Sequence, residues 1–404
     1  MTVISQKDLF PKNIDKFLKT FRKLVDINIK KGIKLKFEIE SRSGREKISP
    51  IIKLAEYEDA KDIAEICKNV YEGTYPYKEM EDEDSIREMI LSSEYQIVLF
   101  KDKENNNIGC FKCILDFKKK KAYMGGFMIR KVYQGKVDIV KAIIGSYMWM
   151  WSTFKDKISL WYCENRTAHA TSQYITSVCG IKTVAILPNK DIFFHKIESD
   201  VFGIIYNEKI LEKNRSKDIP KLIPEINNCF LYANKKFNLG PVEFLYPSLN
   251  LNPFKIQLAK QNFYKKITED KIGYKTIIFS LEKGNSYFTF VYTPWLQNFE
   301  KTRYNVSSLE ELIVFLNEFK KLAKELSVRY VEVLVSAYQP AHQKIFYDAG
   351  LIPRGYIPCW EYNKKVGFFE DYVIFNHFIG EIKNIILLPE GLELLEFLEL
   401  DIPY

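Results

Sequence analysis

A group of polar residues follows a predicted strand near the middle of the chain. The strand covers residues 158–163, and the polar residues that follow it are Glu164, Asn165, His169 and Gln173. Carboxylates and imidazoles are common proton carriers, so Glu164 and His169 could transfer protons here. His169 and Gln173 are four residues apart and could share one side of the helix predicted next. The structural alternative is that Glu164 pairs with a surface lysine, while His169 and Gln173 cap the helix.

Cys110 and Cys113 have the spacing of a metal-binding pair, but their context argues against a metal. They lie in a predicted strand, where residues three apart point to opposite faces. No second pair of cysteines or histidines completes a site, because the four histidines are scattered along the chain. No phosphate-binding loop and no Ser-His-Asp pattern is present either. We therefore expect no metal.

One motif occurs twice, 170 residues apart. Its anchors are Gln173, Gly180 and Pro188 in the first copy and Gln343, Gly350 and Pro358 in the second. In both copies the glycine comes seven positions after the glutamine and the proline fifteen after it, and a strand-like apolar run precedes the motif. A strand–helix–glycine–strand unit used twice predicts two related domains.

Hydrophobic periodicity and turn residues predict the elements that position these motifs. In the first copy we expect strands at 51–54, 95–101, 108–117, 122–129, 158–163 and 183–187, and helices at 59–70, 84–91, 136–154 and 171–179. In the second we expect strands at 276–281, 287–293, 330–335, 354–357 and 371–378, and helices at 308–326 and 341–349. The prediction is an α/β (α+β) protein of two domains, each a mixed, mostly antiparallel sheet flanked by helices. The domains are a helical N-terminal extension (1–50), a first domain (51–200), a helical linker (201–250) and a second domain (251–404).

Composition narrows the class of protein. With 404 residues, of which 47% are hydrophobic, the chain can bury two ordinary cores. The net charge of +8 comes from 60 basic and 52 acidic residues spread along the chain, which is typical of a solvated lysine-rich surface or of weak polyanion contact. The longest apolar stretch, around 139–154, contains polar residues, so we expect no membrane span. Seven cysteines in apolar runs, with no leader-like stretch at 1–20, predict buried reduced thiols and a cytoplasmic location.

The predicted order of elements over about 51–195 resembles the GNAT superfamily of acyl-CoA-dependent N-acyltransferases, and about 270–380 resembles it more weakly. The resemblance implies an acyl-CoA co-substrate, such as acetyl-CoA, and a small-molecule or protein amine as acceptor. It also implies that pantetheine enters between the splayed fourth and fifth strands. The pyrophosphate would then sit on backbone N–H groups at the start of the next helix, where anions are favoured.

The turn that would hold the pyrophosphate departs from the family pattern, Arg/Gln-x-x-Gly-x-Gly/Ala. Gln134 and Gly135 fit, but Val137 and Ile139 replace the signature glycines, and Asp138 would repel phosphate. Basic side chains at 130, 131 and 136 could compensate, or the turn could be a solvated strand-to-helix connection. The residues that the resemblance assigns to the co-substrate are Met128, Ile129, Arg130, Gln134, Gly135, Lys136, Val137, Asp138, Asn165 and Gln173.

The resemblance also implies roles in the transfer. Backbone N–H groups near Met128 or Ile129 would stabilise the oxyanion, and Glu164 or His169 would remove the proton. The family's tyrosine acid falls at Thr176, so Tyr174, two residues earlier, is the candidate acid. Tyr75 and Tyr77, on the loop between the first two helices, would line the acceptor site or simply pack.

The second copy has no glycine-rich turn, so we interpret it as a degenerate domain that packs against the first and walls the acceptor site. Two alternatives remain. One is a transferase resembling the Fem peptidyltransferases, which take aminoacyl-tRNA; the basic balance fits, but a long helical arm and a dense basic patch are absent. The other is a non-catalytic GNAT-fold binding protein.

Overall fold

The computed structural model describes residues 2–5, 9–22, 24, 29, 32–40, 47–383 and 385–400. Its main feature is one fourteen-stranded sheet in which the same strand order occurs twice. The order from one edge to the centre is β3-β4-β5-β6-β7-β9-β8, and from the other edge it is β12-β13-β14-β15-β16-β18-β17. We call these two sets of strands, with their helices, the first half and the second half. The predicted fold class, two mixed and mostly antiparallel units flanked by helices, is confirmed.

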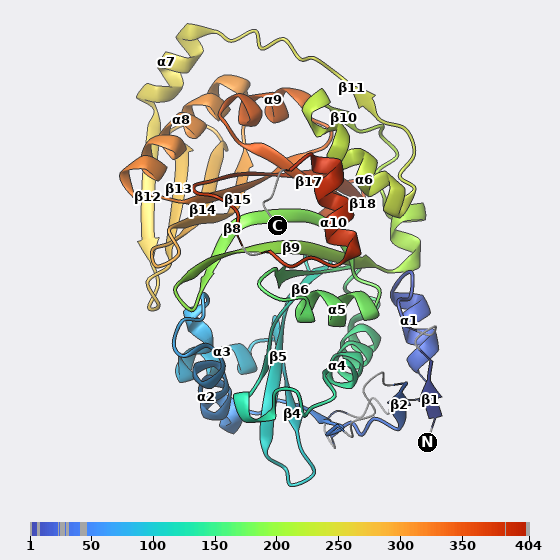
Figure 1. Cartoon of the computed structure of the whole chain (residues 1–404). Coiled ribbons are helices and arrows are strands. Elements are labelled where there is room, and N and C mark those ends of the chain that lie inside the picture. Colours follow the sequence, from blue (N-terminus) through green and yellow to red (C-terminus); the bar gives the residue numbers. More distant parts are fainter. Residues whose placement is uncertain are drawn as a thin grey trace.

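The first half follows the predicted order of elements and adds one strand. Its elements are β3 (Ile51–Leu54), α2 (Ala60–Tyr71), α3 (Glu83–Leu91), β4 (Tyr95–Lys101), β5 (Asn107–Asp116), β6 (Lys121–Ile129), α4 (Ile139–Phe154), β7 (Leu160–Arg166), α5 (Thr171–Val178), β8 (Lys182–Phe193) and β9 (Lys196–Tyr206). Helices α2 and α3 cover one face of the sheet, and α4 and α5 cover the other (Figure 1). Cys110 packs in the core on the first of these faces and Cys113 in the core on the second, as predicted from their spacing.

The second half has the same strands but no helices between its first two. Its elements are β12 (Phe263–Glu269), β13 (Lys275–Leu281), β14 (Tyr287–Thr293), β15 (Asn298–Asn305), α8 (Leu309–Glu325), β16 (Tyr330–Ser336), α9 (Pro340–Asp348), β17 (Ile352–Asn363) and β18 (Phe368–Phe378). Helices α8 and α9 pack on one face with an aromatic core. The loops before β13 and after β14 reach the first half, where Trp295 Nε1 donates to the Pro76 carbonyl at 2.7 Å.

The two halves join where β8 and β17 meet edge to edge. The pairing is a single register position, Gly355 opposite Ala185. A Cβ atom on Gly355 would lie 2.3 Å from the Ala185 Cβ and 2.4 Å from the Val184 carbonyl oxygen. Only glycine allows the two backbones to approach this closely.

The repeated glutamine is a structural clasp in both halves. Gln173 Nε2 donates to the Arg166 and Ile386 carbonyls, and its Oε1 accepts from the Leu388 amide. Gln343 makes the equivalent three bonds, to the Ser336 and Lys221 carbonyls and from the Ile223 amide. Both side chains are buried. Each glutamine therefore holds the segment that follows the last strand of the other half, so the two halves exchange segments.

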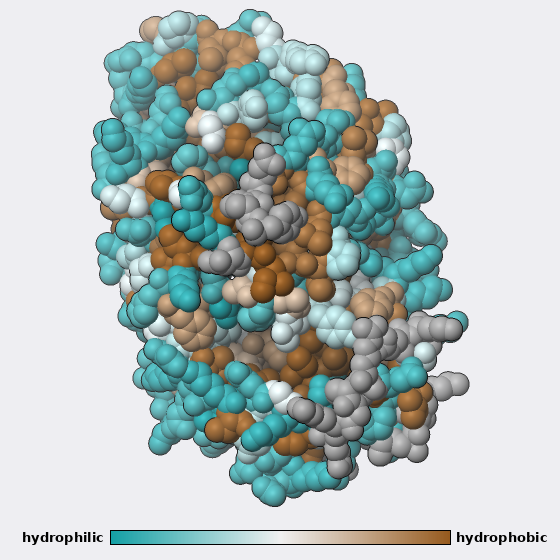
Figure 2. Space-filling view, in the orientation of Figure 1, coloured by the Kyte–Doolittle hydropathy of each residue, from teal (hydrophilic) through white to brown (hydrophobic). Residues whose placement is uncertain are grey.

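The exchanged segments share a further repeat. Each clasped residue precedes a proline and a glutamate, in Ile223-Pro224-Glu225 and Leu388-Pro389-Glu390. The proline begins a helical segment in both places, which its fixed φ angle favours. The helices that follow, α6 (Asn227–Phe237) and α10 (Pro389–Leu398), lie side by side beside β8 (Figure 1). Figure 2 shows mostly hydrophilic residues on this face, with apolar surface gathered near α10.

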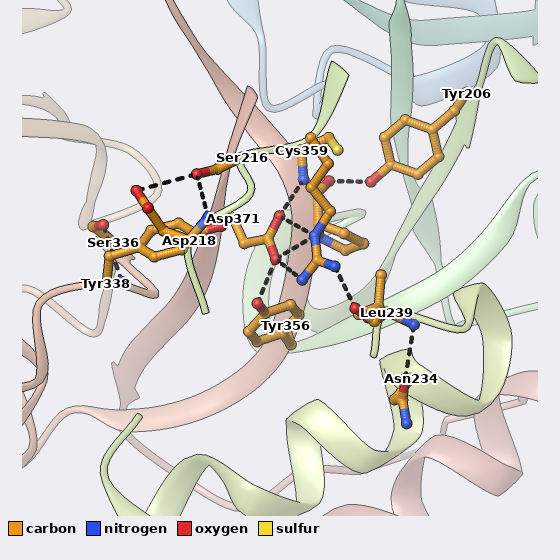
Figure 3. A network of polar contacts seen from close by, with 12 residues as sticks. Tyr206, Ser216, Asp218, Asn234, Leu239, Ser336, Tyr338, Tyr356, Cys359 and Asp371 are labelled. Atoms are coloured by element: carbon orange, nitrogen blue, oxygen red, sulfur yellow. Dashed lines mark hydrogen bonds and ion pairs between the residues drawn. The ribbon is translucent and has the colours of Figure 1, made fainter. Parts of the chain in front are cut away.

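The segment between the halves, predicted as a helical linker at 201–250, contains the helix α6 together with short strands. It contains short strands β10 (Lys221–Leu222) and β11 (Glu243–Phe244) and the helices α6 and α7 (Pro253–Gln261). A buried carboxylate, Asp371, anchors it to the second half by accepting two bonds from Arg215 Nε, at 2.9 and 3.1 Å. The Tyr356 hydroxyl and the Cys359 amide point toward the same carboxylate and donate to it (Figure 3).

Domain boundaries stay a prediction, although β9 runs past the expected boundary at residue 200. The N-terminal part contains β1 (Thr2–Ile4), β2 (Phe37–Ile39) and α1 (Ile14–Phe21), and Phe17 packs on Trp151 of α4. In the predicted helical extension at 1–50, α1 begins at Ile14, and residues 6–8, 23, 25–28, 30–31 and 41–46 lie outside the described residues. All seven cysteines are buried and unpaired. Within the described ranges, no helix combines the length and apolarity needed to cross a membrane.

The clasp yields a first prediction. Gln343→Leu leaves the Lys221 carbonyl and the Ile223 amide buried without partners, so the free energy of unfolding should fall by about 1–3 kcal/mol. Urea unfolding followed by circular dichroism measures the change. The matched control is Gln257→Leu on the exposed surface of α7, which should change stability by less than about 0.5 kcal/mol. Equal losses in the two variants would contradict the clasp.

Candidate active site

Strands β6 and β7 part from each other and open a cavity. They are paired only from Lys121–Tyr123 to Leu160–Tyr162, although β6 continues to Ile129 and β7 to Arg166. Beyond this pairing lies a cavity of about 750 Å³, lined by both strands, the start of α4, the start of α5 and the loop after α2. We call it the acyl cavity. Its position is the gap between the fourth and fifth strands of the first half.

A bulge in β6 forms one wall of the acyl cavity. The register with β5 shifts between Cys110 and Lys112, which leaves Gly126 and Phe127 without a ladder partner. Gly126 has φ +66°, and at Gly125 a Cβ atom would lie 2.6 Å from the Tyr123 ring. The two glycines therefore let the strand bend where Tyr123 folds over it. The backbone freed from the ladder is at Gly126–Phe127, just before the predicted Met128 and Ile129, which also line the cavity.

The turn after β6 offers backbone N–H groups to the same cavity. Gly135 has φ +76° and open space around it. The amides of Gly135, Ile139 and Val140 have no acceptor among the described residues. Asp138 caps α4 by accepting from the Lys141 amide at 3.1 Å, and burial raises the pKa of its carboxyl. A carboxyl that is protonated, or that accepts a hydrogen bond as a helix cap, repels a bound anion less than a free carboxylate does.

A buried charge cluster lies at the base of the acyl cavity, where the halves meet. Lys190 Nζ is 2.7 Å from Glu164, 3.1 Å from Glu332 and 3.5 Å from Glu300. Burial alone would lower the pKa of Lys190, but the three carboxylates together raise it well above its ordinary value. Glu164 belongs to the first half, whereas β15 and β16 of the second half supply Glu300 and Glu332. One lysine thus holds carboxylates from both halves.

Two further carboxylates face the acyl cavity without a partner. Asp191 Oδ1 and Asp200 Oδ1 are buried and accept no hydrogen bond from the described part of the chain. Burial and the nearby Glu164 raise the pKa of Asp200 to about 7, and burial with Asp200 raises the pKa of Asp191 well above its usual range. Asp200 therefore changes its charge near neutral pH, as a general base must.

A second cavity, of about 610 Å³, adjoins the first and lies between the halves. We call it the acceptor cavity. Tyr75, Tyr77, Tyr123 and Glu164 line both cavities, so the two spaces meet at these side chains. Tyr274 of the second half closes the loop that carries Tyr75 and Tyr77, because its hydroxyl donates to Glu79 at 2.7 Å.

The structure brings most of the predicted residues to these cavities. Those that line one or both are Tyr75, Tyr77, Met128, Ile129, Gln134, Gly135, Glu164, Asn165 and His169. Glu164 pairs with the buried Lys190 rather than with a surface lysine. Asn165 is fixed by a bond from its Nδ2 to Thr176 Oγ1 at 3.1 Å. His169 lies at the rim, before α5 begins, where partial desolvation and the nearby Arg166 lower its pKa.

The other predicted residues do not line either cavity. Gln173 is the clasp described above, and Tyr174 is 40% exposed beside Phe10. His169 and Gln173 do not share a helix face, because α5 starts between them, at Thr171. Arg130 Nε donates to the Asn107 carbonyl, Lys136 is exposed, and Val137 is packed in the core against Ile48. Asp138 is occupied as the cap of α4.

Sequence reasoning missed the charged residues of β8, β9, β15 and β16. We predicted no strand over β9 or β15, whose apolar runs are interrupted by charges. The missed residues that line the cavities are Tyr123, Lys190, Asp191, Asp200, Glu300 and Glu332. The signal that could have found them is the same interruption, since charges inside a strand-like apolar run imply buried ionisable groups.

Comparisons with known proteins found likenesses among solved structures alone. No family model and no curated protein matches the chain. Among solved structures, a spermidine N-acetyltransferase from Vibrio cholerae in complex with CoA and spermine is 17% identical, covers 39% of this chain and 95% of its own, and has a TM-score of 0.33. The ribosomal-protein-S5-alanine acetyltransferase from Vibrio fischeri is 15% identical, with 39% and 93% covered and a TM-score of 0.34.

The first half has the order of elements, and the parted fourth and fifth strands, that the resemblance to the GNAT superfamily predicts. Function lives in the site and not in the fold, so the chemistry must be argued from the cavities.

The charge cluster yields a second prediction. Lys190→Met leaves three buried carboxylates without their cation, which should cost about 3–5 kcal/mol at pH 8. Burial already raises the pKa of Glu164, and the loss of Lys190 raises it further. A carboxylate whose pKa is higher in the folded than in the unfolded protein destabilises the fold at pH values above its unfolded pKa. This destabilisation decreases as the pH falls toward the unfolded pKa. The deficit should therefore shrink between pH 8 and pH 5.

Urea unfolding of wild type and variant at both pH values measures the deficit. The matched control is Lys344→Met, which removes an exposed ion pair with Asp348. That substitution should cost about 0.5 kcal/mol or less at either pH. A deficit for Lys190→Met that is small, or that does not change with pH, would show that the cluster is not charged as described.

Proposed function

We propose that the protein is an acyl-CoA-dependent N-acyltransferase whose first half carries out the transfer. The observation that supports this best is the parting of β6 and β7 onto a cavity with ionisable carboxylates at its base. The acyl cavity would take acetyl-CoA or another acyl-CoA, and the acceptor cavity would take the amine. The two substrates would meet beside Tyr123 and Glu164, where the cavities meet.

The residues around the acyl cavity fit a CoA thioester. The free amides at Gly135, Ile139 and Val140, with Lys131 at the rim, would bind the pyrophosphate. Asn165 and the parted strand edges would hold the pantetheine arm, which is an extended amide chain. When bound, the thioester supplies an activated acyl carbon. The unpaired backbone of the bulge at Gly126–Phe127 would stabilise the negative charge that develops on the acyl oxygen.

Asp200 would act as the general base. The acceptor enters as an ammonium ion, and Asp200 takes one proton to free the nitrogen lone pair. That pair forms the C–N bond, the C–S bond breaks with its electrons on sulfur, and the second nitrogen proton goes to sulfur as the thiol forms. Asp200 then releases its proton to solvent. Glu164 is less suited to this role, because Lys190 already holds it.

A third prediction tests acyl-CoA binding at the turn. Gly135 has φ +76°, a conformation that both Asp and Asn tolerate, and nothing obstructs a side chain there. Gly135→Asp adds a negative charge beside the proposed pyrophosphate site, so the Kd for acetyl-CoA should rise by about tenfold or more at low salt. Gly135→Asn is the matched control and should change the Kd little.

Calorimetric titration of both variants and wild type with acetyl-CoA measures this effect, and high salt should narrow the difference. Equal affinities for the Asp and Asn variants would place the pyrophosphate elsewhere. If wild type binds no acetyl-CoA but binds aminoacyl-tRNA, the Fem-like alternative holds instead. If it binds neither, the non-catalytic alternative gains support.

A fourth prediction concerns pH. Because Asp200 must be ionised to accept a proton and its pKa is about 7, kcat/KM for the amine should rise with pH around neutrality. Asp200→Asn should lower the rate by about 10²–10⁴-fold and abolish this rise. Thiol release from acetyl-CoA between pH 5.5 and 8.5 measures both effects. Asp348→Asn, at an exposed site, should keep the wild-type profile; a rise retained in Asp200→Asn would assign the base elsewhere.

A further inference from the structure

Buried negative charge exceeds buried positive charge where the two cavities meet. Five carboxylates surround this point, and the cations near them are Lys190, Arg329 and, beside Asp200, Arg166, which Glu198 already holds through two hydrogen bonds of 2.7 Å. The five carboxylates are those of Glu164, Asp191, Asp200, Glu300 and Glu332. Buried carboxylates without compensating cations are costly, so the cluster needs either protons or a positively charged ligand.

Positive charge is lacking in both cavities, on either side of the point where they meet. Asp191 and Asp200 line the acyl cavity and are each 2% exposed, whereas Glu300 lines the acceptor cavity and is 4% exposed. Each has a buried carboxylate oxygen that accepts no hydrogen bond from the described residues. The nearest cation to Glu300 is Lys190 at 3.5 Å, which Glu164 and Glu332 hold more closely. Two separate positions are therefore short of a positive charge.

The acceptor cavity also accommodates alkylammonium groups. The Lys121 side chain enters it and places Nζ 3.5 Å from the centre of the Trp360 ring, a cation–π contact. Its side chain is almost entirely buried and pairs with Glu361 at 3.3 Å, and burial lowers its pKa to about 7. The rings of Tyr123 and Tyr162 line the same cavity, among charged side chains of both signs. Rings and carboxylates together suit an aliphatic chain that ends in ammonium groups.

We propose that the acceptor is a small aliphatic diamine or polyamine, bound across the two halves with its reacting nitrogen at Asp200 and a second ammonium at Glu300. This inference rests on the proposed function for the transfer itself. It makes the second half part of the acceptor site, because Glu300 lies on β15. The distal ammonium fills the charge deficit that a monoamine would leave.

The test compares pairs of acceptors of equal length. α,ω-Diamines of three to six carbons are measured against n-alkylamines in which a methyl group replaces the distal ammonium. A second ammonium paired with a buried carboxylate should raise kcat/KM by about tenfold or more for the best diamine. In Glu300→Gln this preference should fall to about threefold or less, whereas the exposed control Glu282→Gln should retain it.

Calorimetry with the same amines, without acyl-CoA, separates this inference from the proposed function. Diamine binding that Glu300→Gln weakens supports the cation site, even if no amine is acetylated and the proposed function fails. Acetylation of monoamines as fast as diamines would overturn this inference and leave the proposed function standing. A lysine-containing peptide that is acetylated faster than every diamine would also overturn it. The acetyl-CoA affinity and unfolding midpoint of Glu300→Gln show whether it is folded.

Discussion

The exchange of segments between the two halves is the constraint on which the rest of the structure depends. Gln173 and Gln343 are buried and each make three hydrogen bonds, with one strand end and one incoming segment. Because the segment always comes from the other half, neither half can satisfy its own glutamine. The polar groups in the core of one half thus specify the position of the other.

The exchange of segments fixes how the two halves lie against each other, and this arrangement forms the cavity between them. The segments bring α6 and α10 beside β8, and the close contact of Gly355 with Ala185 fixes β17 at the same edge. The second half is then held against the loop of the first half that carries Tyr75 and Tyr77. Trp295 and Tyr274 close that loop from the second half. The acceptor cavity is therefore a product of the exchange and not of either half alone.

Much of the fold could be predicted from the sequence, because the helices and the apolar strands have clear periodicity. Strands β3, β4 and β14 have the predicted bounds, and α4 and α8 end within a residue of the predicted ends. Three strands of the large sheet were missed, β9, β12 and β15, and two of them, β9 and β15, carry buried charges. Asp200 and Glu300 interrupt the apolar pattern of β9 and β15, as charged residues in loops do. Because of this interruption, the sequence pattern did not indicate the two strands that carry these site residues.

The same limit applies to the repeated motif. The spacing from Gln173 to Gly180 and from Gln343 to Gly350 indicated a repeat, but the resemblance assigned Gln173 to the co-substrate. A glutamine that clasps a peptide segment and one that contacts a ligand have the same sequence context. What distinguishes them is the partner, and here the partner lies more than 200 residues away in the chain.

The two halves differ most in what occupies the gap after the fourth strand. In the first half Val137 is buried against Ile48. The backbone amides there without an acceptor among the described residues are those of Gly135 and of the first residues of α4. In the second half no glycine turn follows β15, and this strand contributes Glu300 to the charge cluster where the halves meet. Lys190 of the first half compensates part of that charge, so the carboxylates of the second half are stable only against the first. The two halves therefore depend on each other, because a lysine of the first half neutralises part of the buried charge that the second half supplies.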